Sequence, residues 1–180
     1  DREGRRAMSP APARPPLAVI LAAIDARATA RASLARFRDE LDGRGDLILV
    51  DASRDGTADV VEARFPGVRV LRRPPGRLAP ELWRDGLEAT DTPLVAFSTA
   101  QMVPSPGWRV ALLDRLEATG AAVVGGPIEP APGLAPWERA VYLLRYVNYL
   151  RPLGDPGRAE PPGDNAAYRR DRLSGLESLW

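Results

Sequence analysis

The sequence predicts an α/β fold in which a mostly parallel β-sheet is flanked by helices. Short apolar runs alternate with stretches of helical periodicity along most of the chain. The apolar runs are continuous rather than interrupted by polar residues, which is typical of strands buried on both faces of a sheet. With 180 residues, of which 44% are hydrophobic and 27% charged, the chain suits one folded domain.

The first part of the chain alternates three predicted strands with two predicted helices. The strands are expected at 17–24, 46–53 and 68–73, and the helices at 29–43 and 57–65. Leu34, Phe37 and Leu41 fall on one face of the first helix, and Gly43 is a helix-ending residue. Residues 1–16 are rich in proline and arginine and are expected to form a flexible segment, so the domain would span 17–180.

The alternation continues in the second part of the chain. We expect a helix at 80–89, a strand at 94–97, a turn and helix over 104–120, a further buried strand within 121–130, and a helix over 135–150. Pro80 suits the first turn of its helix, because proline lacks the N–H group that this position leaves unpaired. A loop rich in proline and glycine is expected at 151–163.

Composition excludes several classes of function. The chain has no cysteine and no histidine, which rules out disulfides, zinc fingers, thiolate nucleophiles and Ser-His-Asp triads. All 25 basic residues are arginine, so Schiff-base chemistry and a P-loop lysine are absent as well. A net charge of +1 gives no electrostatic case for a nucleic-acid partner. The apolar run at 17–24 is too short to cross a bilayer, and we expect a cytoplasmic protein.

Ligands of open α/β sheets bind beyond the carboxyl ends of the strands, so the residues that follow each apolar run are the first site candidates. They are Asp25, residues 51–57, residues 98–101, and the pair Gly125 and Gly126. Asp51 could accept two hydrogen bonds from a base or a ribose. Asp55, Gly56 and Thr57 form a tight turn that caps the next helix. Local chemistry alone leaves open whether this segment binds a ligand or only ends a loop.

The segment LILVDASRDGT resembles the (I/V)VDxSxDGT signature of family 2 glycosyltransferases, which have a GT-A (Rossmann-like) fold. Further segments resemble the family in the same order over residues 17–175. They are PPLAVILAAIDAR, GRLAPELWRDGLEAT, LVAFSTAQMVPSPGW, VGGPIEP and GDNAAYRR, the last resembling an acceptor-side loop. The resemblance implies the inverting transfer of a sugar from a nucleotide-diphosphate sugar to an acceptor hydroxyl.

The resemblance also assigns residues to the donor site. Asp25 and Asp51 would contact the nucleotide, with Asp51 on its base or ribose. Ser53 and Asp55 would shape the pocket around it. Arg77 would lie near the diphosphate, where a guanidinium can bind two oxygens at once, and Asp85 would lie beneath the donor.

One segment departs from the family pattern. Where relatives carry acidic metal ligands, this chain has Ser98, Thr99, Ala100 and Gln101. Magnesium or manganese on a diphosphate usually needs one or two carboxylates. We therefore expect no metal site of the usual kind and no certain cofactor, with arginines stabilising the leaving group instead.

The catalytic base is not evident in the sequence. Relatives place it in an acidic pair beyond the acceptor loop, so the resemblance implies that the domain continues past Trp180. Asp164 and Asn165 are the acceptor-side candidates, and Asp164 is also a candidate base. The alternative is that both tie their loop to backbone groups, as such side chains commonly do in turns. Glu177 is the last acidic residue and matches no motif.

The predicted helix at 135–150 has two unlike faces. Trp137, Val141 and Leu144 share one face, and Tyr142, Tyr146 and Tyr149 point toward another. Such a helix could lie on a membrane surface and present a lipid-linked acceptor. The alternative is a core or interface helix whose tyrosine hydroxyls reach water.

Two function classes stay open. One is the glycosyltransferase. The other is a degenerate, inactive homologue that serves as a nucleotide-sugar-binding or protein-interaction module, in line with the loss of the acidic ligands. A dehydrogenase is disfavoured because no glycine follows the first strand, and a phospho-acceptor regulator is disfavoured because the chain has no lysine.

Overall fold

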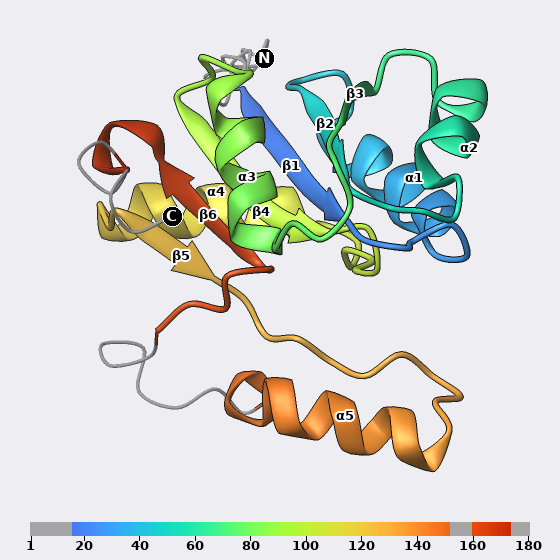
Figure 1. Ribbon diagram of the computed structural model, residues 1–180. Coiled ribbons are helices and arrows are strands. Elements are labelled where there is room, and N and C mark those ends of the chain that lie inside the picture. The colour runs from blue at the N-terminus through green and yellow to red at the C-terminus, as the bar shows by residue number, and fades with distance from the viewer. Residues whose placement is uncertain (1–15, 152–159, 174–180) are drawn as a thin grey trace, which may run out of the picture.

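The computed structural model describes residues 16–151 and 160–173 (Figure 1). Apart from Pro16, the segment predicted to be flexible lies outside the described residues, and so does Glu177. Most of the predicted loop at 151–163 lies outside them as well.

A six-stranded sheet forms the centre of the molecule, with the strand order β3-β2-β1-β4-β6-β5. Four strands run parallel: β1 (Leu17–Ala23), β2 (Leu47–Asp51), β3 (Arg69–Arg72) and β4 (Leu94–Thr99). The strand β6 (Ala166–Arg169) lies antiparallel between β4 and β5 (Val123–Gly125). The predicted mostly parallel sheet is confirmed.

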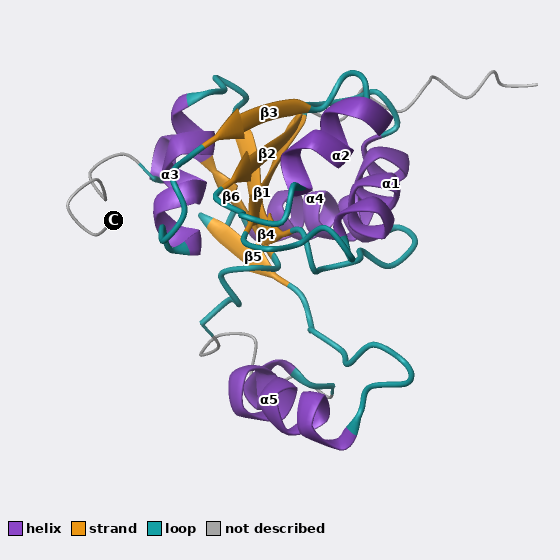
Figure 2. Ribbon diagram, turned by 45° about the vertical axis from the view of Figure 1, so that its right-hand side comes forward, coloured by secondary structure: helices purple, strands orange, loops and turns teal. Residues whose placement is uncertain are grey.

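Helices cover both faces of this sheet (Figure 2). One face carries α1 (Ala30–Leu41), α2 (Thr57–Arg64) and α4 (Trp108–Thr119), and the other carries α3 (Ala79–Glu88). The remaining helix α5 (Pro136–Tyr146) and the 3-10 turn η1 (Val147–Tyr149) lie apart from these layers, while the turn η2 (Arg170–Arg172) follows β6. No helix within the described ranges is long and apolar enough to span a membrane.

The central strand β1 shows why the apolar runs carry no polar alternation. All of its residues are buried, because Leu17, Val19 and Leu21 pack with α1 and α4 while Ala18 and Ile20 pack with α3. The close approach of α3 depends on a glycine. A Cβ atom at Gly86 would lie 2.2 Å from Ile20 Cγ2, so no larger residue fits without a shift of the helix. Leu34, Phe37 and Leu41 are buried together, as the helical spacing predicts.

Three expectations need correction. The segment GDNAAYRR is not only a loop, because Ala166–Arg169 form β6 between two other strands. The strand predicted within 121–130 is a three-residue edge strand in which only Val124 is buried, since β6 pairs with one side of it and leaves the other open. Ser98 and Thr99 belong to β4 rather than to the loop after it, because pairing with β1 continues through Thr99.

Candidate functional site

The parallel register brings the carboxyl ends of three strands to one edge of the sheet. Ala23 of β1 lies opposite Asp51 of β2, and Ala22 lies opposite Thr99 of β4. The backbone N–H of Ala52 donates to Ala23 O at 2.9 Å, and that of Ala100 donates to Ala22 O at 2.9 Å. The loops after β1, β2 and β4 therefore start side by side, where α/β proteins bind ligands.

Residues predicted for the nucleotide site are joined by hydrogen bonds at this edge. Ser53 Oγ donates to Asp51 Oδ1 at 2.5 Å and accepts a hydrogen bond from the Asp25 N–H at 2.9 Å. Asp25 Oδ1 in turn accepts from the Arg54 N–H at 2.8 Å. Asp25 has a φ of 47°, a left-handed conformation that aspartate tolerates better than most residues. These contacts bring Asp25, Asp51 and Ser53 together.

Asp51 keeps a free acceptor at the centre of this group. Its side chain is only 6% exposed, and Oδ1 is taken by Ser53. Within the described part of the chain, no donor is hydrogen-bonded to Oδ2. A buried carboxylate is stabilised by further hydrogen bonds, so this oxygen is suited to accept one from a ligand.

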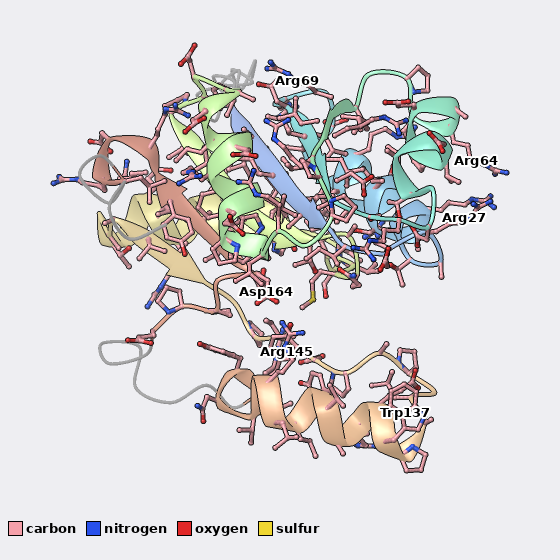
Figure 3. All side chains as sticks on the ribbon, viewed as in Figure 1. Arg27, Arg64, Arg69, Trp137, Arg145 and Asp164 are labelled. Atoms are coloured by element: carbon pink, nitrogen blue, oxygen red, sulfur yellow. The ribbon has the colours of Figure 1, made fainter. Side chains whose placement is uncertain are left out.

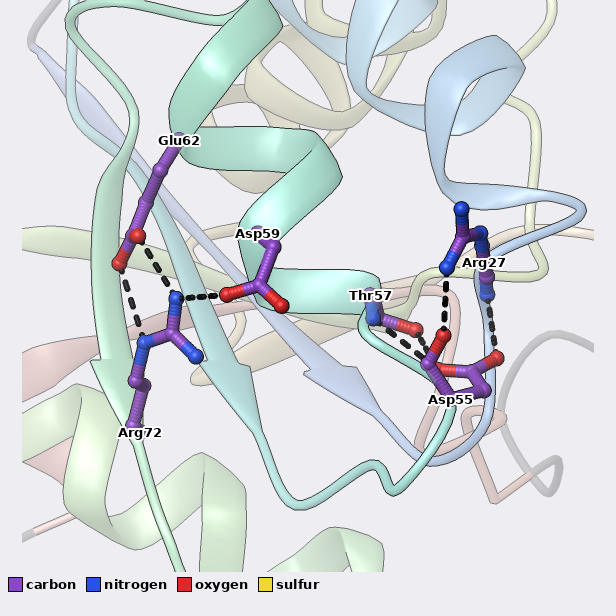
Figure 4. A network of polar contacts seen from close by, with 6 residues as sticks. All are labelled: Arg27, Asp55, Thr57, Asp59, Glu62 and Arg72. Carbon is purple, nitrogen blue, oxygen red and sulfur yellow. Dashed lines mark hydrogen bonds and ion pairs between the residues drawn. The ribbon is translucent and has the colours of Figure 1, made fainter.

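Asp55 connects the loops after β1 and β2 (Figure 4). Asp55 Oδ1 accepts from the Thr57 N–H at 3.0 Å and from Thr57 Oγ1 at 2.5 Å, and Oδ2 accepts from the Arg27 N–H at 2.9 Å. Burial opposes ionisation of Asp55, but these hydrogen bonds outweigh it and lower its pKa below the ordinary value. Both oxygens are used within the protein. Asp55 thus precedes the N-cap residue Gly56, accepts from the first N–H of α2, and shapes the site without a free oxygen for a ligand.

A cluster of arginines around Asp85 lies beyond the end of β3. Asp85 Oδ2 accepts from Arg73 Nε at 2.5 Å, and Asp85 Oδ1 lies 3.5 Å from Arg77 Nη2. The Arg73 N–H donates to the Asp51 carbonyl at 2.7 Å, which joins this cluster to the end of β2. The structure thus brings Arg77 and Asp85 together.

Arg73 is the residue that sequence reasoning missed. In a chain with 25 arginines, residue type alone does not single it out. Its position does, since it directly follows β3 and lies at the same edge as Asp51. This is the signal that pointed to Asp51 itself.

The end of β4 holds neighbouring elements in place. Ser98 O accepts from Trp83 Nε1 at 2.7 Å, and Gln101 Nε2 donates to Ile24 O at 3.3 Å. Across the described ranges, no three acidic residues come together in a way that could hold a metal ion. Hydroxyl and amide groups without a carboxylate are a poor ligand set for magnesium or manganese. The residues at 98–101 therefore do not fit the metal ligands of the family.

On the acceptor side, Asp164 and Asn165 have different partners. Asn165 Oδ1 accepts from Trp108 Nε1 at 2.7 Å, and Asn165 Nδ2 donates to Pro127 O at 2.9 Å, so this side chain ties the loop down. Asp164 is 8% exposed, and its Oδ2 accepts from the Tyr146 hydroxyl at 2.6 Å. Burial and this hydrogen bond raise the pKa of Tyr146 above its ordinary value. For Asp164 the partner is a side chain of α5 rather than the backbone group we considered.

The two faces of α5 have opposite surroundings. Its tyrosine face is turned inward, with Tyr142 buried and its hydroxyl donating to Ile128 O at 2.5 Å. On the opposite face Trp137 is 68% exposed and Leu144 is 85% exposed. Figure 3 shows Asp164 on the side of the sheet that faces α5, and Trp137 at the far end of that helix. The helix thus stands over the acceptor side with its apolar face uncovered.

Comparisons with known proteins identify the family and the fold. The family model described as Glycosyl transferase family 2 matches residues 19–175. Among curated proteins, none matches. The mannosyltransferase PcManGT from Pyrobaculum calidifontis, solved with GDP-Man and Mn2+, superposes with a TM-score of 0.67 at 18% identity, over 92% of this chain and 48% of its own.

Two further solved structures have the same fold. Glucosyl-3-phosphoglycerate synthase from M. tuberculosis has a TM-score of 0.62 at 24% identity, over 88% of this chain and 58% of its own. The TarS fragment 1–349 from S. aureus, solved with UDP-GlcNAc, has a TM-score of 0.60 at 12% identity, over 88% of this chain and 46% of its own. The chain thus spans about half the length of the structures that it matches.

Proposed function

This chain belongs to glycosyl transferase family 2, and we propose that it binds a nucleotide-diphosphate sugar and transfers the sugar to an acceptor hydroxyl with inversion. The observation that carries the proposal is Asp51, a buried carboxylate with one free oxygen where the carboxyl ends of the strands meet. Solved relatives of the same fold were obtained with GDP-Man and with UDP-GlcNAc, which supports a nucleotide sugar as the donor.

In this proposal the donor site is formed by the loops after β1 and β2. Asp51 Oδ2 accepts hydrogen bonds from the ribose or base, while Ser53 holds Oδ1 and fixes the carboxylate. Asp25 lies beside it through its contact with Ser53. Asp55 holds the two loops together through its hydrogen bonds with Arg27 and Thr57. A site that is already ordered loses less entropy when the ligand binds.

The proposed reaction is a single displacement at the anomeric carbon. The acceptor oxygen forms a bond to that carbon as the bond from the same carbon to the diphosphate oxygen breaks, and the nucleoside diphosphate leaves with the electron pair. A carboxylate takes the acceptor proton. Within the described residues Asp164 is the candidate for this base, and on binding the acceptor it would exchange the Tyr146 hydroxyl for the acceptor hydroxyl.

We further propose that α5 contacts an anionic membrane surface and presents a lipid-linked acceptor. Its outward face is apolar, with Trp137, Val141 and Leu144 exposed. Arg139 and Arg145 are exposed and outnumber Glu138 within the helix, although Arg145 lies over the Tyr146 ring, and Arg151 is paired with Glu129 at 2.9 Å. An exposed apolar helix face on a segment with a small positive net charge suits the boundary between lipid headgroups and acyl chains. A cytoplasmic protein that binds a membrane only at its surface fits this proposal.

Vesicle sedimentation tests the membrane contact. We expect the chain to sediment with vesicles containing phosphatidylglycerol and to bind less to pure phosphatidylcholine. Leu144→Asp should abolish the binding, whereas Glu117→Gln on α4, away from the proposed surface, should leave it unchanged. Equal fractions of the wild type and of Leu144→Asp in the vesicle pellet would contradict the membrane contact. Sedimentation of the wild type without vesicles, through self-association, would contradict it as well.

A second function rests on a specific observation. The absence of carboxylates at 98–101 favours an inactive module that binds a nucleotide sugar without turning it over. A panel of UDP- and GDP-sugars separates the two functions, with released nucleoside diphosphate as the measured product. Release in the presence of an acceptor, reduced by Asp51→Ala, supports the transferase. Donor binding without release of nucleoside diphosphate supports the binding module. The absence of both donor binding and release would contradict both functions.

A further inference from the structure

We propose that this chain binds the diphosphate of its donor through Arg73 and Arg77, without a divalent cation. The inference rests on the proposed function, since it concerns the same donor site. It departs from the solved mannosyltransferase of this fold, which was obtained with Mn2+ as well as with its donor. Three features of the described residues support it: the end of β4, the acidic side chains of the site, and the arginine pair.

The end of β4 contributes contacts that stabilise the fold rather than metal ligands. Ala100 is fully buried in the core, and its N–H donates to Ala22 O at 2.9 Å. Ser98 is 2% exposed, and its carbonyl accepts from Trp83. Gln101 reaches across to Ile24 O with its amide nitrogen. Neutral groups used in this way offer a hard cation no charge to compensate the loss of its water.

The acidic side chains of the donor site are also engaged. Asp25 accepts from a backbone N–H, Asp55 uses both oxygens on the loops, and Asp85 uses both on arginines. Asp51 and Asp25 each keep one free oxygen, but within the described ranges they are not part of a group of three acidic side chains that could hold a metal ion. A magnesium or manganese ion on a diphosphate would therefore find two carboxylate oxygens without a hydrogen bond among these four residues, one on Asp25 and one on Asp51, which belong to different loops.

The arginine pair has hydrogen-bond donors left for phosphate oxygens. A guanidinium has five N–H groups. Arg73 uses Nε on Asp85 and Nη1 on the Arg72 carbonyl, which leaves Nη2. Arg77 directs Nη2 at Asp85, and its Nε lies 3.3 Å from Glu81 Oε1 without a hydrogen bond, which leaves Nη1 and Nε as donors. Their side chains are 32% and 25% exposed, so both are within reach of a ligand while Asp85 fixes their orientation.

The neighbouring Arg72 provides a matched control, because successive residues of a strand point to opposite faces of the sheet. Its guanidinium pairs with Asp59 and with Glu62 of α2, each at 2.7 Å (Figure 4). Arg73 pairs instead with α3, on the other face. Two adjacent arginines of equal charge therefore lie in different places, and only Arg73 faces the proposed diphosphate site.

Calorimetric titration of the chain with UDP and GDP tests the proposal. We expect the affinity in a chelator and in excess Mn2+ to agree within about twofold. An affinity that rises by about tenfold or more with Mn2+ and falls again with chelator would overturn the inference and leave the proposed function intact. Failure of both nucleotides to bind under either condition would overturn the proposed function, and this inference with it.

Arginine variants test which groups replace the cation. Arg73→Gln and Arg77→Gln should each weaken binding of the nucleoside diphosphate by about fivefold or more, since each loses a charge-assisted contact. The nucleoside without phosphates should bind the wild type and these two variants with equal affinity. Arg72→Gln should bind the diphosphate as the wild type does. Unchanged affinity of both variants, or equal losses with Arg72→Gln, would overturn the assignment.

A gain of metal dependence completes the test. Thr99 and Gln101 lie on either side of the buried Ala100 and are themselves partly or fully exposed. The double variant Thr99→Asp/Gln101→Asp should bind the diphosphate more weakly in chelator and recover with Mn2+. The matched variant Thr99→Asn/Gln101→Asn should show no such difference. A wild type that already responds to Mn2+ as the Asp variant does would overturn the inference.

Discussion

The strand-end loops and the helix α5 are held in the molecule by different means. After β1 and β2, hydrogen bonds link the two loops through Asp25, Ser53 and Asp55. The helix α5 has one buried side chain, Tyr142, and reaches the sheet through the Tyr146 hydroxyl on Asp164. Its tyrosines are buried or half-buried, and its large apolar side chains are exposed.

This difference separates two tasks within one domain. The loops after β1 and β2 keep Asp51 in place before any donor arrives, as expected of a preorganised site. The few contacts of α5 suit a part whose position depends on a further surface. We therefore expect substitutions in the sheet layers and the loops to affect stability and donor binding, and substitutions on α5 to affect neither strongly.

The largest difference between the sheet layers and α5 is expected in the stability lost when a large side chain is truncated. Phe37→Ala in α1 should lower the free energy of unfolding by about 3–5 kcal/mol, because the residue is 1% exposed and leaves a cavity. Leu144→Ala on α5 should change it by no more than about 0.5 kcal/mol. Urea unfolding followed by circular dichroism measures both. A similar loss in the two variants would show that α5 is packed as firmly as α1.

The loop network should be sensitive to Asp55. Asp55→Ala removes the acceptor for Thr57 and Arg27 and should cost about 1–2 kcal/mol of stability at neutral pH. Because the folded state lowers the pKa of Asp55 below 3.8, its contribution is present above about pH 4 and is lost as the pH falls below that value. Unfolding free energies of wild type and variant should therefore converge in acid. A constant difference from neutral pH down to about pH 3 would contradict this role.

Asp51 allows donor binding to be separated from stability. Asp51→Ala should weaken UDP or GDP binding by about tenfold, through the loss of one charge-assisted hydrogen bond, and the protein should stay folded. Asp46→Ala is the matched control, since Asp46 precedes β2 and accepts from Thr90 and Thr92 at the other end of the strand. It should leave the affinity unchanged. Unchanged affinity in Asp51→Ala would remove this residue from the site.

The smallest effect is expected at the contact between α5 and Asp164. Tyr146→Phe should lower the stability by about 1 kcal/mol, because the hydrogen bond to Asp164 is lost. Amide exchange should become faster in α5 and stay the same in α1. Since the folded state raises the pKa of Tyr146, its contribution is present below about pH 10 and is lost as the pH rises further. The stabilities of the wild type and of Tyr146→Phe should therefore converge in alkali. Faster exchange throughout the molecule would contradict a local contact.

The layers of the fold could be predicted from the sequence because the strands in its centre are buried on both faces. The runs at 17–24 and 46–53 carry that signal without ambiguity, and β1 and β2 lie within them. The strand β6 carries no such signal. It has four residues, and its identity depends on pairing with β4 and β5, which come from distant parts of the chain.

The candidate site was predictable in part, for a similar reason. Asp25, Asp51 and Ser53 follow predicted strands, so the topology places them at one edge. The contact of Tyr146 with Asp164 depends on how α5 folds back onto the loop before β6, which periodicity does not reveal. Arg73 was missed because its proposed role depends on which side of the sheet its side chain takes just after β3 ends, and that becomes clear only from its contact with Asp85.

Amide exchange of the wild-type chain with and without UDP or GDP, resolved by peptide, shows whether the loops after β1 and β2 bind the nucleotide. We expect slower exchange on nucleotide binding in the segments 24–27 and 51–57 and no change over α5. Protection confined to other parts of the molecule, with these two segments unaffected at saturating nucleotide, would contradict it.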